Sequence, residues 1–586
     1  MCGIFGYVGE ARSVPATVGV ALKSLEYRGY DSWGMVWQAP ERLETVKKIG
    51  KVPTSFTFDA MSRIAIGHTR WATHGGVTDA NAHPHLDAAG RIAIVHNGIV
   101  ENARDLRLLL ARAPVFASET DSEVIAHLLG ERVAAGYNLV QALCAIFPLL
   151  KGQNAVIAID QREEVIAAAM NVSPLVIGAG EQGCYISSDP FALAGKATEM
   201  IVVPNEVVVR LGPDGITGFS YAGSRIPLPD AHPVPDVSVD ELDGHAHFMA
   251  KEIAEQPAVL LAQLDDVESS RRLGTLIREA SQVVLTGCGS AYYAARTGST
   301  WLATLAGVRA LSVPASEFDD VAPYLEAGAL VVAVTQSGET ADILEAMRTA
   351  RAHGATIAAV VNVEHSSAAR FADHVIPLLA SRERSVLATK SMTVMLARLL
   401  VATGICAGTG ASVVQEVRDA ASTIAELSDA AGFDAAVDRV ARIVANAGHV
   451  YVIGKGIGLG VAQEAALKIK EASYVHAEAF AAGELKHGAI ALIEEGTPCF
   501  VFNPDTRFVA DCGSSAHELR SRGGYTIGIG MQPGNGISDA IAIPNHGPSS
   551  AIVQVFVAQR IAYRTALLRN LDPDYPRNLA KSVTVK

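Results

Sequence analysis

The amino-acid sequence predicts an α+β domain of sheets covered by helices, followed by two α/β domains that each contain a doubly wound parallel sheet. Three observations lead to this fold class. Short strand-like runs dominate the chain before residue 225, regular strand–helix alternation follows residue 250, and one strand–glycine turn–helix pattern occurs twice. At 586 residues the chain is also too long for a single hydrophobic core.

Composition and charge limit the function classes. Hydrophobic residues make up 49% of the chain and charged residues 19%, which is typical of a compact globular protein. The net charge of −13 argues against nucleic-acid binding, which needs a basic surface. No apolar run is long enough to span a membrane. Seven scattered cysteines without a CxxC pair favour a reducing compartment, so we expect a soluble cytoplasmic protein.

The N-terminal part alternates strand-like runs with a few helical patterns. The runs are IFGYV, RIAIG, RIAIVHNG, NAVIAI, CYISS and NEVVVRL. The helical patterns cover Val14–Leu25, Asn102–Arg112 and Asp121–Ala134. This mixture predicts sheets covered by helices over residues 2–225. A segment rich in proline and aspartate then predicts a linker over residues 226–245.

The second half has a different rhythm. Its runs QVVLTG, ALVVAVT, TIAAVVN and HVYVIG are apolar throughout and alternate with alanine-rich helical segments. Strands that are apolar on both faces predict parallel sheets. The segments QVVLTGCGSAYYAAR and HVYVIGKGIGLGVAQ form an internal repeat, and neither has the spacing of a dinucleotide-binding GxGxxG. We therefore predict two similar domains, 250–425 and 426–572, and a C-terminal tail, 573–586.

The chain begins MCGIFGYVGE. The small side chain of Cys2 favours removal of Met1, which would make Cys2 the N-terminus. Such a residue carries a thiol nucleophile and an α-amine whose unperturbed pKa of ~7.7–8.0 allows it to act as a base. The alternative interpretation is that Cys2 is simply a small residue before a core strand.

Four polar segments of the first half, GHTRWATHG, NAHPH, HNGIVEN and ETDSE, carry the other candidate residues. Asn97 and the Gly98 N–H could stabilise the oxyanion formed when a thiol attacks an amide. Arg70 could bind a carboxylate and Asp121 an ammonium group, which are the two ends of an α-amino acid. The predicted substrate is glutamine. Asp121 could instead, or also, be a helix N-cap.

These segments contain several histidines, but none has the spacing of helical metal ligands, so we predict no metal site. The histidines are His68, His74, His83, His85 and His96.

In the second half, VTQSGETADIL lies between an apolar strand and a helix. Its hydroxyl and N–H groups predict a phosphate cradle formed by Thr335, Gln336, Ser337 and Thr340. The corresponding segment of the second repeat, VFNPDTRF, lacks this set of hydroxyls.

Three charged residues, Glu464, Lys468 and Glu471, fall on one face of a predicted helix. A solvated face of ion pairs is the ordinary interpretation. The apolar neighbouring residues instead favour burial, and a buried glutamate near a lysine can shuttle protons. His487 is a candidate second acid or base. Lys581, among small and β-branched residues of the tail, is a candidate Schiff-base former.

The motifs MCGI, EYRGYDS, HTRWATHG, HNGIVEN, TQSGET, HAEAFAAGELKHG and PRNLAKSVTV resemble those of the isomerizing glutamine–fructose-6-phosphate aminotransferases, over essentially the full length. The resemblance implies an N-terminal-nucleophile (αββα layered), class II glutamine amidotransferase domain and two sugar-isomerase (SIS) domains. It also implies glutamine and fructose 6-phosphate as substrates, glucosamine 6-phosphate as product, no cofactor or metal, and a homodimer.

The resemblance further implies roles for individual residues. Cys2 would be the nucleophile, with Asn97 and Gly98 as oxyanion hole, and Trp71 would gate an ammonia channel. Glutamine would be held by Arg70, Thr73, His74 and Asp121. Lys581 would form the Schiff base, Glu471 would move the proton between C1 and C2, and His487 of the neighbouring subunit would open the sugar ring. Glu464 and Lys468 belong to the same cluster, and Ser290 would lie close to the phosphate held by Thr335, Gln336, Ser337 and Thr340.

Three positions depart from the family pattern. Ala291 and Ala388 stand where a serine usually contacts the phosphate or the sugar, and Trp33 stands where a small residue is usual. Each lost hydroxyl removes a hydrogen bond worth ~0.5–1.5 kcal/mol. The same chemistry on a related ketose phosphate is therefore an alternative, and a non-catalytic sugar-phosphate sensor is a second one.

Overall fold

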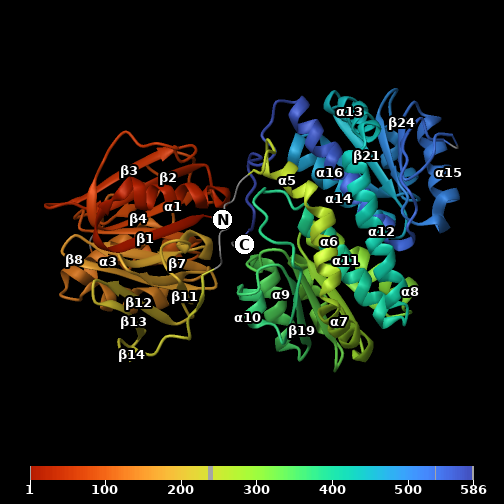
Figure 1. Ribbon diagram of the computed structural model, residues 1–586. Helices are drawn as coiled ribbons and strands as arrows, with labels where there is room; N and C mark the ends of the chain where they lie inside the picture. The colour runs from red at the N-terminus through yellow and green to blue at the C-terminus, as the bar shows by residue number, and fades with distance from the viewer. Residues whose placement is uncertain (1, 112, 235–241, 535, 584–586) are drawn as a thin grey trace. The chain divides into compact units, whose positions relative to one another are not determined.

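The computed structural model describes residues 2–111, 113–234, 242–534 and 536–583 (Figure 1). The chain divides into two compact units, Met1–Glu241 with Ala580–Lys586, and Leu242–Leu579. Met1 and parts of the predicted linker and tail, 235–241 and 584–586, lie outside the described residues. No helix in the described ranges is both long enough and apolar enough to cross a membrane.

The first unit contains two sheets whose strand orders are β15-β11-β9-β10-β1-β4-β2-β3 and β14-β13-β12-β8-β7-β6-β5. Neighbouring strands such as β1 and β4, or β6 and β7, pair antiparallel. The strands are β1 Gly3–Ser13, β2 Ser32–Gln38, β3 Leu43–Ile49, β4 Met61–Arg70, β5 His85–Leu86, β6 Ile92–Gly98, β7 Asn154–Asp160, β8 Glu163–Asn171, β9 Val176–Gly180, β10 Gly183–Ser187, β11 Glu199–Val202, β12 Val207–Gly212, β13 Gly215–Ser220, β14 Arg225–Ile226 and β15 His232–Pro233.

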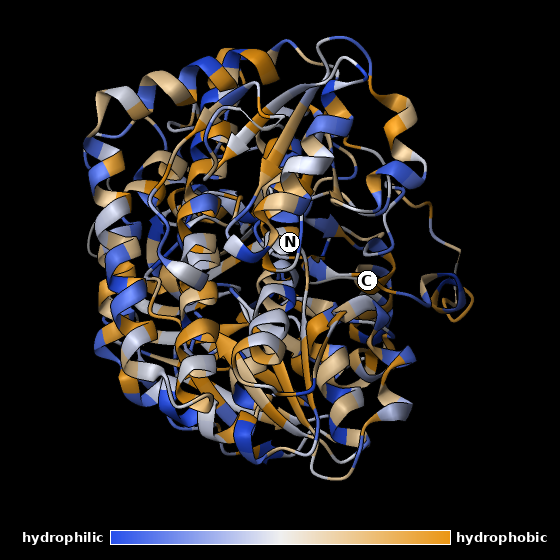
Figure 2. Cartoon of the chain, turned by 90° about the vertical axis from the view of Figure 1, so that its right-hand side faces the viewer, coloured by the Kyte–Doolittle hydropathy of each residue, from blue (hydrophilic) through white to orange (hydrophobic). Residues whose placement is uncertain are grey.

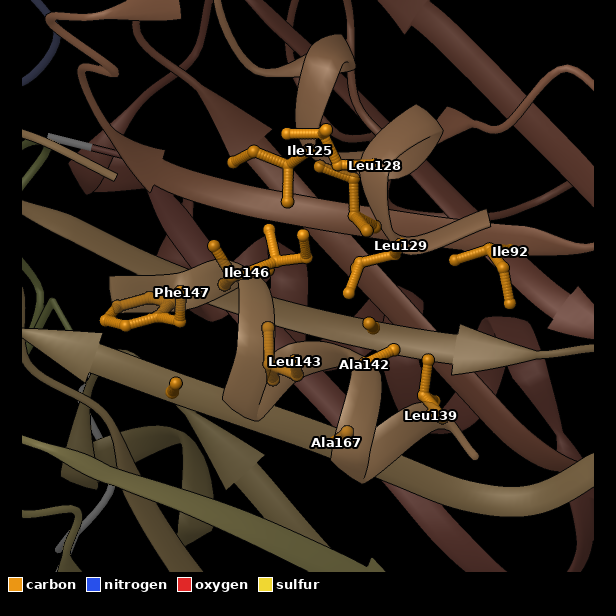
Figure 3. Close-up of a cluster of buried hydrophobic side chains, with 14 of the residues drawn as sticks. Ile92, Ile125, Leu128, Leu129, Leu139, Ala142, Leu143, Ile146, Phe147 and Ala167 are labelled. Carbon is orange, nitrogen blue, oxygen red and sulfur yellow. The ribbon is translucent and has the colours of Figure 1, made fainter. Parts of the chain in front are cut away.

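The side-chain alternation of these strands produces four layers. On β7, Ile157 and Ile159 face the other sheet, whereas Val156 faces the helices. β1 likewise buries Ile4 between the sheets and Phe5 against α1. A strand with apolar residues on both faces requires a covering layer on each side. The order is therefore helix, sheet, sheet, helix, which confirms the αββα expectation. Figure 3 shows the outer cluster that α3 and α4 form over the second sheet.

The helices of the first unit only partly follow the predicted patterns. They are α1 Val20–Leu25, preceded by a π-helical turn at Pro15–Gly19, α2 Ala103–Arg107, α3 Glu123–Ala134 and α4 Leu139–Ile146. The helix predicted over Asn102–Arg112 ends at Arg107, because the leucines that follow lack a buried face: Leu108 is 83% exposed. α4, with a capping box at Asn138, was not predicted.

The second unit contains two five-stranded parallel sheets, as the apolar runs predicted. Their orders are β17-β16-β18-β19-β20 and β22-β21-β23-β24-β25. The strands are β16 Val283–Gly287, β17 Ala310–Pro314, β18 Leu330–Thr335, β19 Thr356–Val361, β20 His374–Pro377, β21 His449–Gly454, β22 His476–Ala481, β23 Pro498–Phe502, β24 Tyr525–Ile529 and β25 Asp539–Ile541. In both sheets the chain adds a strand on one side of the first strand and then crosses to its other side.

Helices cover these sheets, and the apolar strands lie inside them (Figure 2). The helices are α5 Phe248–Ala254, α6 Gln256–Asp265, α7 Val267–Glu279, α8 Ser290–Leu305, α9 Ala341–Ala352, α10 Ser367–Phe371, α11 Lys390–Cys406, α12 Gly410–Asp429, α13 Ala431–Ala445, α14 Ile457–Ser473, α15 Val509–Arg520 and α16 Ser550–Leu568.

The internal repeat is visible in the backbone at the starts of α8 and α14. Their N-caps, Gly289 and Gly456, share one unusual conformation, φ 55° and ψ −127° against φ 59° and ψ −126°. The two helices also pack together closely, since a Cβ on Gly460 of α14 would lie 2.2 Å from Thr297 Oγ1 of α8. The first helix of each repeat therefore meets its counterpart, and this brings the two sheet edges into one region.

Candidate active sites in the two units

Cys2 directly precedes β1 in the sequence. In space it lies next to the end of β4, where Trp71 follows Arg70. The Trp71 N–H donates to Cys2 Sγ at 3.3 Å. The Gly3 N–H donates to Thr69 Oγ1 at 3.1 Å, which anchors the start of the chain on β4. Burial raises the pKa of the Cys2 thiol. The thiol therefore needs a base to become a nucleophile.

Asn97 and Gly98, at the end of β6, lie beside Cys2. Asn97 Nδ2 donates to the Cys2 carbonyl oxygen at 3.1 Å, and Asn97 is buried. Gly98 has a φ of 132°, and a Cβ there would lie 1.9 Å from the Gln153 carbonyl oxygen. Only glycine fits this position. The structure thus brings the predicted nucleophile and the predicted oxyanion donors together.

Arg70 is buried, and its guanidinium is engaged with the loop that follows it. Nη1 donates to the Gly76 carbonyl at 3.1 Å, and Nη2 donates to the His74 carbonyl at 2.5 Å. Thr73 and His74 are exposed on this loop. Burial lowers the pKa of Arg70, while the nearby Cys2, Asp31 and Asp121 act in the opposite direction. Arg70 therefore shapes the loop and lies within electrostatic range of the nucleophile.

Asp121 lies near this group but does not cap α3. Its Oδ2 accepts the Val100 N–H at 2.6 Å, and the N-cap of α3 is Ser122, whose side chain makes no capping bond. The N-cap interpretation is wrong because Asp121 precedes the helix by two residues and its carboxylate bonds the segment after β6 instead. That bond fixes the start of the IVEN segment, next to Gly98.

Three further residues support the nucleophile, and the sequence analysis assigned them no role. Arg28 Nε donates to the Cys2 carbonyl at 3.4 Å, and its Nη1 donates to Asp189 Oδ2 at 3.0 Å. Asp31 Oδ2 accepts the Ala72 N–H at 2.8 Å. Arg28 and Asp31 belong to the EYRGYDS motif. This motif was the signal that could have identified them.

The buried histidines of these segments pack against one another, with tilted or edge-on rings. The ring centroids of His83 lie 4.1 Å from His68 and 4.5 Å from His85. His96 Nδ1 lies 2.8 Å from Ser122 Oγ. Burial lowers the pKa of His68 to about 3, so the ring is neutral at pH 7. Among the described residues no three His, Cys, Asp or Glu side chains are grouped as ligands for a metal ion.

The predicted phosphate loop lies at the carboxyl end of β18, next to that of β16, where Ser290 begins α8. Strand order reverses between these two strands, and ligands of doubly wound sheets bind at such a point. Thr335 Oγ1 accepts the Gly338 N–H at 3.1 Å. Gly338 has a φ of 68°, and a Cβ there would lie 2.0 Å from Ser366 Oγ. The loop is therefore tightly shaped.

The remaining hydroxyls of this loop have defined environments. Ser337 Oγ accepts the Glu339 N–H at 3.2 Å. Thr340 is the N-cap of α9, and its side chain makes no capping bond. Gln336 is half-buried, and its carbonyl accepts the Asn362 N–H at 3.2 Å. Hydroxyls and N–H groups at the start of α9 can thus bind an anion.

The α14 cluster is buried, as predicted. Lys468 Nζ lies 3.6 Å from Glu464 Oε1 and forms a closer ion pair with Glu471. Glu464 and Lys468 are at most 1% exposed, and Glu471 is half-buried. Ser290 Oγ donates to Glu464 Oε1 at 3.1 Å, which joins the cluster to the edge of the first sheet. Burial raises the pKa of Glu464 to about 7, although Lys468 opposes this shift.

The matching families cover both units. A glutamine amidotransferase domain matches residues 68–195, and SIS domains match residues 276–403 and 443–569. The chain is 39% identical to a glutamine–fructose-6-phosphate aminotransferase [isomerizing] of Symbiobacterium thermophilum and to one of Streptomyces coelicolor, with 100% of this chain and of each relative covered. The chain belongs to the isomerizing glutamine–fructose-6-phosphate aminotransferase family.

A solved structure of the same family supports the fold of the second unit. The C-terminal domain of glucosamine-fructose-6-phosphate aminotransferase from Francisella tularensis is 27% identical, with a TM-score of 0.51 over 57% of this chain and 100% of that chain. The positions where this chain departs from the aminotransferase pattern have distinct environments. Ala291 is buried in the first turn of α8 and Ala388 is half-buried before α11. Trp33 packs edge-on against Phe56 within the core, at 5.6 Å between ring centroids.

Two residues that the aminotransferase pattern makes catalytic lie on segments other than α14. His487 is exposed in the short 3₁₀ turn Leu485–His487, and its ring makes no hydrogen bond among the described residues. Lys581 is half-buried and groups with the first unit. Their roles remain predictions.

Proposed function

We propose that the chain converts fructose 6-phosphate and glutamine into glucosamine 6-phosphate and glutamate. One observation supports this most strongly. The chain holds Cys2 against Asn97 and Trp71 in one unit and, in the other, a Glu–Lys–Glu cluster bonded to Ser290 at the carboxyl end of the sheet that carries the hydroxyl loop. The first arrangement suits nitrogen release from an amide. The second suits proton transfer on a phosphorylated sugar.

In the first unit, Cys2 with Met1 removed would use its own α-amine as base. The thiolate attacks the side-chain amide carbon of glutamine, and Asn97 Nδ2 and the Gly98 N–H receive the oxyanion. The carbon–nitrogen bond then breaks, ammonia leaves, and water hydrolyses the thioester to glutamate. Glutamine itself is held by Arg70, Thr73, His74 and Asp121. Asn97 already donates to the Cys2 carbonyl, so its amide is held close to the reacting atoms.

In the second unit, the phosphate binds Thr335, Gln336, Ser337 and Thr340, with Ser290 close by. The amine of Lys581 adds to C2 of the open-chain ketose and water leaves, giving a Schiff base; ammonia then replaces the lysine. Glu471 removes a proton from C1 of the resulting C2 imine and returns it to C2, while the C1 hydroxyl loses its proton, which gives the 2-amino aldose. Lys468, between Glu464 and Glu471, holds the charge of the base.

Three further features belong to this proposal. Ammonia passes from the first reaction to the second through a channel that Trp71 gates. The enzyme is a homodimer in which His487 of the neighbouring subunit opens the sugar ring. It acts in the cytoplasm, which its seven free cysteines support because thiols stay reduced there.

Product analysis tests the function directly. Purified protein, with Met1 removal verified by the intact mass of its N-terminal peptide, is incubated with glutamine and fructose 6-phosphate. Equal amounts of glutamate and glucosamine 6-phosphate are expected. Cys2→Ala should lose glutamine-dependent synthesis but keep synthesis from added ammonia. Wild-type protein that forms no glucosamine 6-phosphate would refute the proposal.

A second candidate is the same chemistry on a different ketose phosphate. Ala291 lies next to Ser290 at the start of α8, and Ala388 precedes α11, so both remove hydroxyls near the proposed sugar site. A panel of ketose 6-phosphates with glutamine as nitrogen donor separates the two candidates. A kcat/KM at least tenfold higher on another member than on fructose 6-phosphate would favour the second.

A further inference from the structure

The segment that follows α16 is anchored to the second unit before it reaches Lys581. The Asp574 carboxylate accepts the N–H groups of Phe248 and Met249, both at 2.8 Å, at the start of α5. The Asp574 carbonyl accepts the Val386 N–H at 3.3 Å. This anchor fixes the beginning of the tail. It leaves the direction of the residues that follow undetermined.

A second contact determines that direction. The Arg577 N–H donates to the Tyr474 hydroxyl at 2.6 Å, and the Arg577 guanidinium carbon lies 4.3 Å from the centre of the Tyr474 ring. Backbone and side chain of one residue therefore both bind one tyrosine. The hydrogen bond fixes the position of the tail backbone, and the cation–π contact fixes the direction of the side chain.

Tyr474 occupies an informative place on α14. It is the C-cap of that helix, with φ 58° and ψ 16°, and its N–H donates to the Lys470 carbonyl. Glycine or asparagine usually occupies such a left-handed C-cap, because a Cβ is unfavourable there. Tyr474 lies three residues, slightly less than one helical turn, beyond Glu471. The tail is thus fastened to the end of the helix that carries the acid–base cluster.

We propose that Tyr474 is a positioning residue that, through Arg577, delivers Lys581 to the sugar. Lys581 follows Arg577 by four residues, and four extended residues reach at most about 14 Å. When Arg577 is bound to Tyr474, the chain length therefore limits the positions that the Lys581 amine can occupy to a small volume around the end of α14. This inference rests on the proposed Schiff-base role of Lys581.

Reductive trapping tests it on the full-length protein. Fructose 6-phosphate and borohydride convert a Lys581 Schiff base into a stable secondary amine, which peptide mass spectrometry quantifies. Tyr474→Gly removes both contacts while suiting the left-handed backbone, and should slow trapping at least tenfold. Arg577→Ala, at an exposed position, keeps the backbone hydrogen bond and loses only the cation–π contact, so it should slow trapping about threefold. Tyr474→Phe loses only the hydroxyl and should slow trapping about threefold.

The KM for fructose 6-phosphate should stay within twofold, because the phosphate loop is a separate element, and glutamine hydrolysis at Cys2 should be unchanged. Arg569→Ala is the matched control: Arg569 is also an exposed arginine after α16, and it donates to the Ala445 carbonyl at 3.0 Å, away from Tyr474. Trapping in this control should match wild type.

The possible outcomes separate the two proposals. If wild type is trapped at Lys581 and both Tyr474→Gly and Arg577→Ala are trapped equally fast, the positioning role is wrong and the Schiff base stands. If wild type gives no adduct at Lys581 while making product, the Schiff base is wrong and the positioning role fails with it. A slowed trapping that appears equally in Arg569→Ala also overturns the role of Tyr474.

Discussion

The carboxyl edges of the two parallel sheets in the second unit share a framework and differ in chemistry. Both follow the same strand order, and both begin their first helix at a glycine with the same φ and ψ. β18 ends at Thr335, and the loop after it carries Ser337 and Thr340. After β23 the corresponding loop carries Asp505 and Arg507, whose side chains bind each other, with Arg507 Nη2 2.6 Å from Asp505 Oδ2.

This difference explains how a duplicated fold can build one site. Because the aspartate of this loop already neutralises its arginine, the loop has little positive charge available to bind a phosphate. The second repeat instead contributes α14, whose Glu464 accepts a hydrogen bond from Ser290 of the first repeat. Under the proposed function, one copy would bind the substrate and the other would supply the acid–base groups. Five changes test this division of labour.

The largest expected effect is the loss of the proposed base. Glu471→Gln should lower kcat for glucosamine 6-phosphate formation about 10³-fold, because general base catalysis contributes ~10²–10⁴-fold. Solvent deuterium exchange at C1 of the sugar should fall in parallel. Glu478→Gln, an exposed glutamate on β22, is the control and should keep wild-type activity. A loss below tenfold in Glu471→Gln would exclude it as the base.

The shape of the phosphate loop comes next. Gly338→Ala places a Cβ 2.0 Å from Ser366 Oγ at a φ of 68°. Strain and overpacking of about 3 kcal/mol should raise the KM for fructose 6-phosphate roughly 100-fold. Gly354→Ala has a φ of 80° but no neighbour within 4 Å, so it adds strain without a clash and should leave KM near wild type. Equal KM values for the two variants would show that the loop does not bind the phosphate.

The buried acid of α14 should make stability depend on pH. Because burial raises the pKa of Glu464 from 4.5 to about 7, the folded state binds more protons than the unfolded state between these values. Stability from this group is present below pH 4.5 and is lost as pH rises to about 7, on the order of 3 kcal/mol. Glu464→Gln should flatten this part of the unfolding free-energy profile measured with urea. A profile identical to wild type would mean that Glu464 ionises normally.

Local sequence patterns predicted the parts of the molecule that depend on neighbouring residues. The apolar strands β16, β18, β19 and β21, the buried face of α14 and the glycine–hydroxyl loop after β18 follow from period and residue type alone. Several strands were missed, β2 and β3 among them. The run LETVKKI of β3 has charged residues on its exposed side and few apolar ones, so its strand character comes mainly from pairing with β2.

Contacts between distant parts of the chain were not predictable in the same way. The bond from Arg28 to Asp189 joins residues 161 apart, and that from Arg577 to Tyr474 joins residues 103 apart. Neither residue of either pair shows a local signal for its partner, because tertiary packing alone brings them together. The hydrogen bond from the Val100 N–H to Asp121 is also a tertiary contact, so the sequence pattern predicted a helix cap at Asp121 instead. Motifs identified the chemistry, and packing determined the supporting residues.

A smaller effect distinguishes the two loops directly. Thr340→Val removes a hydroxyl at the start of α9, and one hydrogen bond to a charged phosphate oxygen is worth about 1.5 kcal/mol. The KM for fructose 6-phosphate should rise about tenfold. Thr506→Val, in the loop after β23, should change it less than twofold. If Thr506→Val weakens binding as much as Thr340→Val, both edges contact the substrate and the proposed division of labour is wrong.

The smallest effect concerns the identity of the sugar. Ala291→Ser restores a hydroxyl next to Ser290 in the first turn of α8, at a site with little free space since Ala291 is 9% exposed. One added hydrogen bond of ~0.5–1.5 kcal/mol should lower the KM for fructose 6-phosphate by roughly 2–12-fold if this sugar is the natural substrate. Ala441→Ser, a buried alanine on α13, is the matched control for the added hydroxyl. If Ala291→Ser leaves the KM for fructose 6-phosphate unchanged or raises it, the alanine fits a different phosphosugar, and the ketose panel should then identify it.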